Sequence, residues 1–263
     1  MREFAYARPS SLADAASAFS GGGEAAFIAG GHTLLPAIKS RLRMPDTLVD
    51  LAAIPGLSGV SRSGDVLSIG AMTTHAAVSS DKTVTAAIPG LACLAAGIGD
   101  QQVRNRGTIG GVLANNDPAA DYPAAALALD ATIVTDRGSH AADDYFQGMF
   151  STALDEGEII TRVDFKVPTG FAYAKFRHPA SRYALVGVAV ARFGSKVRVA
   201  VTGAGPGVFR WTAAEAALSA DFSAKSVAGV VLDSGDLNTD MHAGAEYRAH
   251  LAGVMLAQAI KGA

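Results

Sequence analysis

The 263-residue sequence contains a single cysteine, and this scarcity excludes two kinds of chemistry within the chain. One cysteine cannot form an internal disulfide, and it cannot supply the set of thiolates that holds an iron–sulfur cluster. The cysteine, Cys93, lies in an apolar segment that we expect to be helical. A free thiol in such a segment behaves as a small hydrophobic group. These features fit a cytoplasmic protein, which is what we expect.

Charged residues are also few, at 17% of the chain, and neither sign dominates. Lys and Arg number 22 against 24 Asp and Glu, and no basic stripe is visible, so we do not expect nucleic acid as the main partner. Apolar runs are interrupted by charge or glycine before they reach membrane-spanning length. Residues 1–6 include an acid and no apolar segment, so we expect no signal peptide.

Motifs for nucleophilic catalysis and for triphosphate binding are missing. The sequence has neither G-x-S-x-G nor G-x-x-x-x-G-K-[ST]. The stretch Gly203–Gly207 lacks dinucleotide-binding spacing, and Pro206 removes an N–H group, so we predict a structural turn there. No two histidines have helical metal-ligand spacing, and we expect no metal site and no catalytic residue in this chain. The six histidines stand at positions 32, 75, 140, 178, 242 and 250.

The 49% of hydrophobic residues are enough for a sizeable core, and the length suits one large or two modest domains. Hydrophobic periodicity predicts an α+β chain with its internal boundary at 168–170. The second part is then a small sheet with helices on one side. Helices are predicted over 9–19, 33–43, 88–98, 122–129, 212–220 and 245–260, with another beginning at 73–78. Strands are predicted over 26–29, 48–51, 57–61, 66–70, 131–135, 158–165, 185–193 and 196–202, with edge or strand character at 143–146.

Two glycine-rich stretches, each after an apolar residue or run, are the strongest functional signal. Ala29–Thr33 stands at a predicted strand-to-helix turn, where an anion can meet backbone N–H groups. Gly107–Asp121 contains the adjacent pair Gly110–Gly111, which can form a nest of N–H groups for anionic or carbonyl oxygens. A tight turn between core elements explains either stretch alone. Both together suggest two contacts to one elongated ligand.

Asp117 and Asp121, at the end of the second stretch, allow three interpretations. They can form a general acid/base pair, cap the helix predicted to begin near Pro123, or accept hydrogen bonds from ligand hydroxyls. We favour the second and third, because no nucleophile lies nearby in the sequence. The preceding run 101–106 is polar, which is typical of a surface segment or a subunit contact.

Three motifs in this order resemble a known family: Ala29–Pro36, Gln102–Gly111 and Asn116–Asp121. Together they are similar to the flavoprotein (medium) subunit of molybdenum hydroxylases, the group of aerobic carbon monoxide dehydrogenases and xanthine dehydrogenase-like enzymes. The stretches Arg182–Ala184 and Ala245–Leu256 also fit, so the resemblance covers nearly the whole chain.

The resemblance implies non-covalent FAD in a two-part domain of the vanillyl-alcohol-oxidase (PCMH) type, over 1–167 with sub-parts of about 1–54 and 55–167. A small α/β C-terminal domain with an antiparallel sheet follows, over 168–263. The first loop would wrap the pyrophosphate, the second would lie along the flavin and ribityl parts, and Tyr183 would cover one face of the isoalloxazine. Residues expected to bind the cofactor are Ala29, Gly30, Gly31, His32, Thr33, Thr108, Ile109, Gly110, Gly111, Asn115, Asp121, Ile160 (or its neighbour Ile159), Lys175 and Tyr183.

The resemblance also implies partners. A large molybdopterin-binding subunit would hydroxylate the substrate, and a small [2Fe-2S] subunit would pass electrons to FAD in this chain. FAD would then reduce an external acceptor: quinone, NAD⁺ or O₂. This chain departs from the family pattern at Val112, where many members have Asn or Ser, and at 178–181, where carbon monoxide dehydrogenases carry a charged loop. A self-contained flavin oxidoreductase and a non-enzymatic FAD-binding module are the alternatives.

Overall fold

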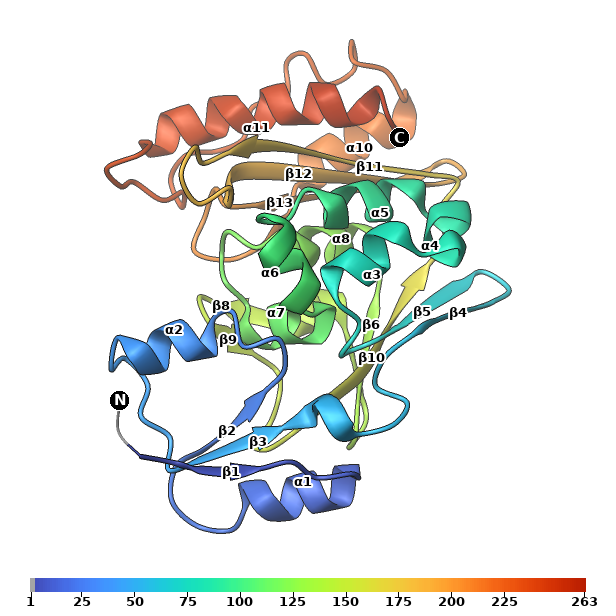
Figure 1. Cartoon of the computed structure of the whole chain (residues 1–263). Coiled ribbons are helices and arrows are strands. Elements are labelled where there is room, and N and C mark those ends of the chain that lie inside the picture. Colours follow the sequence, from blue (N-terminus) through green and yellow to red (C-terminus); the bar gives the residue numbers. More distant parts are fainter. Residues whose placement is uncertain (1–2) are drawn as a thin grey trace.

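The computed structural model describes residues 3–263, which form mixed helix-and-strand structure arranged in order along the chain (Figure 1). A small sheet with two helices lies at the N-terminal end, a larger antiparallel sheet with a group of helices lies in the middle, and a second antiparallel sheet under two helices lies at the C-terminal end. No helix within residues 3–263 is long and apolar enough to cross a membrane.

The N-terminal part is a three-stranded parallel sheet in the order β1-β3-β2. Its elements are β1 (Ala5–Ala7), α1 (Leu12–Phe19), β2 (Ala25–Ile28), α2 (Leu34–Lys39), β3 (Thr47–Asp50) and the short 3-10 turn Leu51–Ala53. The predicted order strand, glycine loop, helix, strand is confirmed. The predicted helix 33–43 ends earlier, because the chain turns into the left-handed region at Arg41, with φ of 60°.

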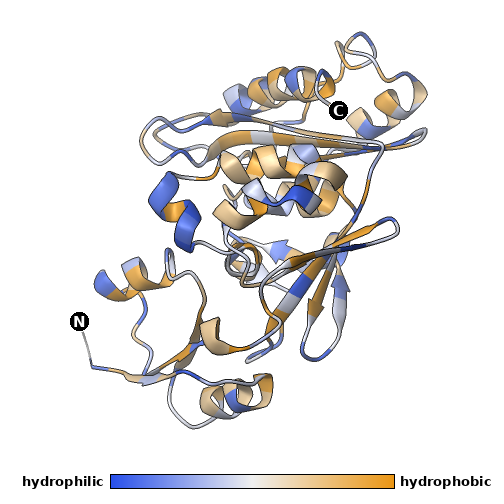
Figure 2. Cartoon of the chain, turned by 45° about the vertical axis from the view of Figure 1, so that its right-hand side comes forward, coloured by the Kyte–Doolittle hydropathy of each residue, from blue (hydrophilic) through white to orange (hydrophobic). Residues whose placement is uncertain are grey.

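The middle part is a five-stranded antiparallel sheet in the order β4-β5-β10-β6-β7. The strands are β4 (Val60–Ser63), β5 (Val66–Gly70), β6 (Thr132–Thr135), β7 (Ser139–Ala141) and β10 (Ile160–Lys166), and β8 (Phe146–Gly148) pairs separately with β9 (Ser151–Thr152). The helices are α3 (His75–Ser80), α4 (Lys82–Ala87), α5 (Pro89–Ala96), α6 (Gln101–Arg106), α7 (Ile109–Asn115), α8 (Tyr122–Ala128) and α9 (Ala142–Tyr145). The helices between the two larger sheets are mostly hydrophobic (Figure 2).

Two local predictions in this part are wrong. Residues 143–145, expected to have edge or strand character, belong to the short helix α9. The glycine pair Gly110–Gly111, expected in a turn, lies in the first turn of α7. Cys93 does lie in the apolar helix α5, although on its exposed side. The sequence patterns at these positions are short, so tertiary packing determines whether the residues form helix, strand or turn.

The C-terminal part is a four-stranded antiparallel sheet in the order β11-β12-β13-β14. Its strands are β11 (Gly170–Arg177), β12 (Ala184–Phe193), β13 (Lys196–Thr202) and β14 (Phe209–Arg210), and its helices are α10 (Thr212–Ala220) and α11 (Ala245–Ile260). Side chains alternate along β12: Val188 and Val190 pack under the two helices, whereas Ala189 and Ala191 join the core of the middle part. The small residues on that face permit close contact between the sheet and α5 and α8.

Gly90 in α5 lies at a close contact between the two larger parts. A Cβ on Gly90 would lie 2.2 Å from the carbonyl oxygen of Phe171, at the start of β11. Gly253 in α11 is also a helical glycine, but it lies at an open position, because a Cβ there would meet nothing within 4 Å.

We expect these two glycines to respond oppositely to alanine. Gly90→Ala should lower the free energy of unfolding by about 1–3 kcal/mol, because the backbone at Phe171 must move. Gly253→Ala should raise it by about 0.5–1 kcal/mol through helix propensity alone. Urea unfolding followed by circular dichroism measures both, and equal effects of one sign would contradict the interpretation of the contact.

Candidate cofactor site

The two glycine-rich loops predicted to share one ligand lie in contact. A Cβ on Gly30 would lie 2.2 Å from the carbonyl oxygen of Arg106 and 2.8 Å from the Cα of Gly107. A Cβ on Gly111 would lie 3.6 Å from the Cβ of Ala29. The loop after β2 therefore rests against the junction of α6 and α7, and the lack of a side chain at Gly30 is a steric requirement of that contact.

The first loop presents unused hydrogen-bond donors. Within residues 3–263, the backbone N–H groups of Gly30, Gly31, His32 and Thr33 donate to no other protein group. Gly31 has a φ of +75°, a conformation that glycine adopts without strain. Thr33 occupies the N-cap position of α2 but its side chain makes no capping bond. Consecutive free N–H groups of this kind form a concave site for anionic oxygens.

The second loop differs, and the prediction of an N–H nest at Gly110–Gly111 is wrong. The N–H of Ile109 donates to Thr73 O at 3.1 Å, and that of Gly110 donates to Ala71 O at 2.8 Å. The N–H of Gly111 donates to the Oγ1 of Thr108 at 3.2 Å, so Thr108 is the N-cap of α7. Threonine three residues before the second glycine is a capping signal that sequence analysis missed.

Glycine at position 110 is needed for packing. A Cβ there would lie 2.5 Å from the Cβ of Ala71, so the backbone of α7 can approach the segment after β5 only without a side chain. The N–H of Ala71 in turn donates to Thr161 O at 2.9 Å, which joins the loop to β10 beside the buried Ile160. Ile160 thus lies in the core close to the second loop.

A buried histidine lies behind the second loop. His75 is only 2% exposed, and its backbone N–H donates to Gly107 O at 3.0 Å. A Cβ on Gly107 would lie 2.5 Å from the Nε2 of the His75 ring. Its Nδ1 and the hydroxyl of buried Tyr122 make no hydrogen bond to a described residue, and the two rings lie 5.3 Å apart. Sequence analysis counted His75 only among scattered histidines; its position after the N-cap Thr74 was the available signal.

The pKa of His75 is lowered to about 4, mainly by burial and to a smaller extent by the nearby His32 and Arg104. His75 is therefore neutral near pH 7. A protonated imidazole behind Gly107 would be a poorly solvated charge beside other cations, which disfavours the folded state.

The end of α7 is held by Asn116, which lies in the left-handed region with φ of 43°. Its amide donates to Gly148 O at 2.8 Å and to Ser151 O at 2.7 Å. Asn115, the expected cofactor contact, is the last residue of α7 and half-buried. Val112, the departure from the family pattern, packs partly buried against the core.

The two acidic residues of the second stretch do not cap α8. Asp121 stands at its N-cap position without a side-chain capping bond, and Asp117 accepts from Ala119 N at 2.9 Å. Instead the Asp121 carboxylate is buried and lies 3.0 Å from the Nζ of Lys175, and it accepts from the hydroxyl of Tyr173 at 2.5 Å. Burial raises the pKa of Asp121, and the ammonium of Lys175 opposes the shift. The helix-cap interpretation of both residues is therefore wrong.

Tyr183 lies beside the same acidic segment. It is 45% exposed, and its pKa is raised by burial first and then by the carboxylates of Asp117 and Asp121. The next residue, Ala184, donates its N–H to Ala119 O at 3.3 Å. The structure thus brings Asp121, Lys175 and Tyr183 together at the contact between the middle and C-terminal parts.

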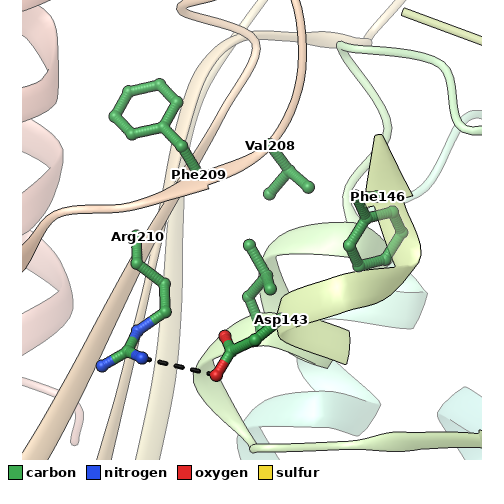
Figure 3. A pocket seen from close by; sticks show the side chains of 6 residues that line it. Asp143, Phe146, Val208, Phe209 and Arg210 are labelled. Atoms are coloured by element: carbon green, nitrogen blue, oxygen red, sulfur yellow. Dashed lines mark hydrogen bonds and ion pairs between the residues drawn. The ribbon is translucent and has the colours of Figure 1, made fainter. Parts of the chain in front are cut away.

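A separate pocket lies between α9 and β14 (Figure 3). Arg210 and Asp143 form an ion pair of 3.4 Å in it, and Glu215 also binds Arg210. Its charged groups are thus already partnered. Its other lining residues are Leu127, Phe146, Val208 and Phe209. None of the predicted cofactor-binding residues lines this pocket.

Comparison with protein families gives two matches that together span almost the whole chain. Residues 2–169 match the family described as the FAD binding domain in molybdopterin dehydrogenase. Residues 171–263 match the family described as the CO dehydrogenase flavoprotein C-terminal domain.

Two curated relatives align with this chain along nearly their full length. The carbon monoxide dehydrogenase medium chain of Hydrogenophaga pseudoflava is 34% identical, over 99% of this chain and 96% of the relative. The nicotine 6-hydroxylase medium subunit of Paenarthrobacter nicotinovorans is 36% identical, over 92% of this chain and 91% of the relative.

Solved structures agree in fold. A chain of carbon monoxide dehydrogenase from Hydrogenophaga pseudoflava superposes with a TM-score of 0.87 at 33% identity, covering 100% of this chain and 97% of that one. A chain of quinoline 2-oxidoreductase from Pseudomonas putida 86 superposes with a TM-score of 0.89 at 31% identity, covering 99% and 96%.

The low pKa of His75 predicts a pH dependence of stability. Because the folded state binds fewer protons than the unfolded state below the unfolded pKa of about 6.5, stability should fall as the pH drops from there towards the folded pKa. The loss attributable to His75 should be about 2 kcal/mol between pH 7 and pH 5.

Urea unfolding of the wild type and His75→Leu over this pH range measures the difference, since leucine cannot titrate while other groups titrate in both proteins. Parallel pH profiles would show that His75 is not the group responsible.

Proposed function

The chain belongs to the FAD-binding family of molybdopterin dehydrogenases, and we propose that it transfers electrons from the iron–sulfur clusters of a partner subunit to an external acceptor. It is an FAD-binding subunit of an oxidoreductase. The observation that supports the proposed binding mode is the row of unused N–H groups at Gly30–Thr33, directly beside the capped first turn of α7.

The residues present fit FAD. The pyrophosphate is anionic, and the free N–H groups of the first loop, with the Thr33 hydroxyl, are donors suited to it. In the proposed arrangement Thr108–Gly111 forms the adjoining wall, where Gly111 offers backbone without a side chain. When bound, FAD supplies the redox chemistry. The chain's own residues bind and orient the group, and no side chain needs to act as a nucleophile.

We assign the remaining contacts on the same basis. Asn115 ends α7, Ile160 lies on β10 next to the residue that binds Ala71, and Tyr183 lies near the carboxylates of Asp117 and Asp121. Residues 1–167 would form a binding domain of the PCMH type, with the small parallel sheet (about 1–54) and the five-stranded sheet (55–167) meeting at the two loops. Residues 168–263 would form the second domain, which contributes Tyr183 from the turn between β11 and β12 and carries Lys175 on β11 beside it.

We propose a large molybdopterin-binding subunit and a small [2Fe-2S] subunit as partners. The relatives are named as medium chains or subunits, and a chain of a Cu,Mo-CO dehydrogenase shares the fold. Their names refer to compounds as different as carbon monoxide and the ring compounds nicotine and quinoline, although the carbon monoxide and quinoline enzymes share the fold of this chain. This pattern supports substrate choice by a different subunit, and a shared electron-transfer role for the flavoprotein.

Substitution at Gly111 tests the binding site. Gly111→Val should abolish co-purification of FAD while the chain still folds, because its side chain would enter the wall of the site; the Cβ alone would lie 2.9 Å from the Oγ1 of Thr108. Gly138→Val is the matched control. Gly138 lies in another turn, and a Cβ there would meet nothing within 4 Å. FAD released on denaturation and circular dichroism of each variant are the measurements. Normal FAD content in Gly111→Val would refute the assignment of the second loop.

Electron transfer is tested by anaerobic reduction of the bound flavin, followed by its absorbance. The isolated chain should not be reduced by substrates of the complex, and addition of the molybdenum and iron–sulfur subunits should make reduction rapid. Turnover of a small substrate by the isolated chain would instead favour a self-contained oxidoreductase, and flavin that stays oxidised with both partners present would favour a non-enzymatic FAD-binding module.

A further inference from the structure

The ammonium of Lys175 has no hydrogen left for a cofactor. Its Nζ lies 3.0 Å from Asp121 Oδ2, 3.2 Å from Gly97 O and 3.1 Å from Arg182 O. An ammonium has three N–H groups, so these acceptors use all of them. The Lys175 and Asp121 side chains are each only 5% exposed. Lys175 therefore acts on other parts of the protein, and it does not donate to FAD.

The three acceptors come from three separate segments. Gly97 is the C-cap of α5, Asp121 precedes α8, and Arg182 lies in the turn between β11 and β12. The second oxygen of Asp121 accepts from Tyr173, a neighbour of Lys175 on β11. Lys175 thus ties the β11–β12 turn (178–183) to two segments of the middle part.

Arg182 strengthens this attachment from within the turn. Its φ of 64° places it in the left-handed region, its N–H donates to His178 O at 2.9 Å, and its guanidinium donates to Gly99 O at 3.3 Å. On the outer side of the turn, His178 Nε2 lies 3.3 Å from His242 Nδ1, in a solvent-exposed contact. Lys175 and Arg182 therefore fasten the turn to the middle part by their side chains, in addition to the backbone bond from Ala184 to Ala119 O.

The residue next to Arg182 is Tyr183, whose ring is close enough to Asp117 and Asp121 for both carboxylates to raise its pKa. We propose that Lys175 and Arg182 are positioning residues that hold Tyr183 at the FAD site and thereby set the environment of the flavin. This inference rests on the proposed function, since it assumes that Tyr183 faces the flavin.

The test uses the FAD-loaded chain and the fluorescence of its flavin, because a tyrosine ring in contact with a flavin quenches that fluorescence. Tyr183→Ala should raise the fluorescence of the bound flavin several-fold. Arg182→Gly should reproduce at least half of that rise, since glycine accepts the positive φ without cost while the bond to Gly99 is lost. Lys175→Met should do the same by freeing the Arg182 carbonyl.

Lys175→Met also leaves the buried Asp121 without its cation, which can prevent folding. Arg182→Gly does not disturb that pair, and it decides the question if Lys175→Met does not fold. Lys166→Met is the matched control, because Lys166, at the end of β10, is an exposed lysine that also pairs with an aspartate, Asp130. It should leave the fluorescence unchanged.

Hydrogen exchange of the peptide 176–184 gives a second readout, and the backbone amide at position 182 should exchange faster in Arg182→Gly and Lys175→Met than in the wild type. Wild-type fluorescence in a folded, FAD-loaded Arg182→Gly, or in Tyr183→Ala, overturns the inference and leaves FAD binding intact. A wild-type chain that neither carries nor takes up FAD overturns the proposed function instead.

Discussion

The contact between Gly30 and the junction of α6 and α7 is the constraint on which the site depends. Only a residue without a side chain allows the first loop to approach the Arg106 carbonyl this closely. The junction itself is held by three backbone hydrogen bonds: His75 donates to Gly107 O, and the carbonyls of Thr73 and Ala71 accept from residues 109 and 110. Through this contact, the small parallel sheet is placed so that its unused N–H groups adjoin the capped turn of α7.

The C-terminal part completes the same region from the other side. Its sheet presents alanines such as Ala189 and Ala191 to the middle part, and this permits the close packing that Gly90 also requires. The β11–β12 turn is thereby brought to Asp121, where Lys175 neutralises a buried carboxylate. A buried carboxylate that lost this cation would be costly, so the two parts are joined by charge as well as by apolar area.

Features that depend only on residues close together in the sequence were predictable. The strand–glycine loop–helix–strand order near the N-terminus, the strand at 66–70, the helix that begins near residue 75 and the long strands β12 and β13 all follow from local pattern and are confirmed. The resemblance identified the FAD-binding family from three motifs, and the family matches confirm it. The errors at Gly110–Gly111 and at Asp121 concern partners that lie far away in the sequence, such as Ala71 and Lys175.

The sequence by itself determined the positions of both glycine-rich stretches, the places of the longer strands and helices and the family, because glycine conformation, side-chain periodicity and motif order are properties of short stretches. Only the tertiary structure decided which amides stay free for a ligand. The first loop leaves its N–H groups unused, whereas the second donates its own to Thr73, Ala71 and Thr108. A backbone N–H binds whichever acceptor the fold brings within reach, and that acceptor cannot be read from the adjacent residues.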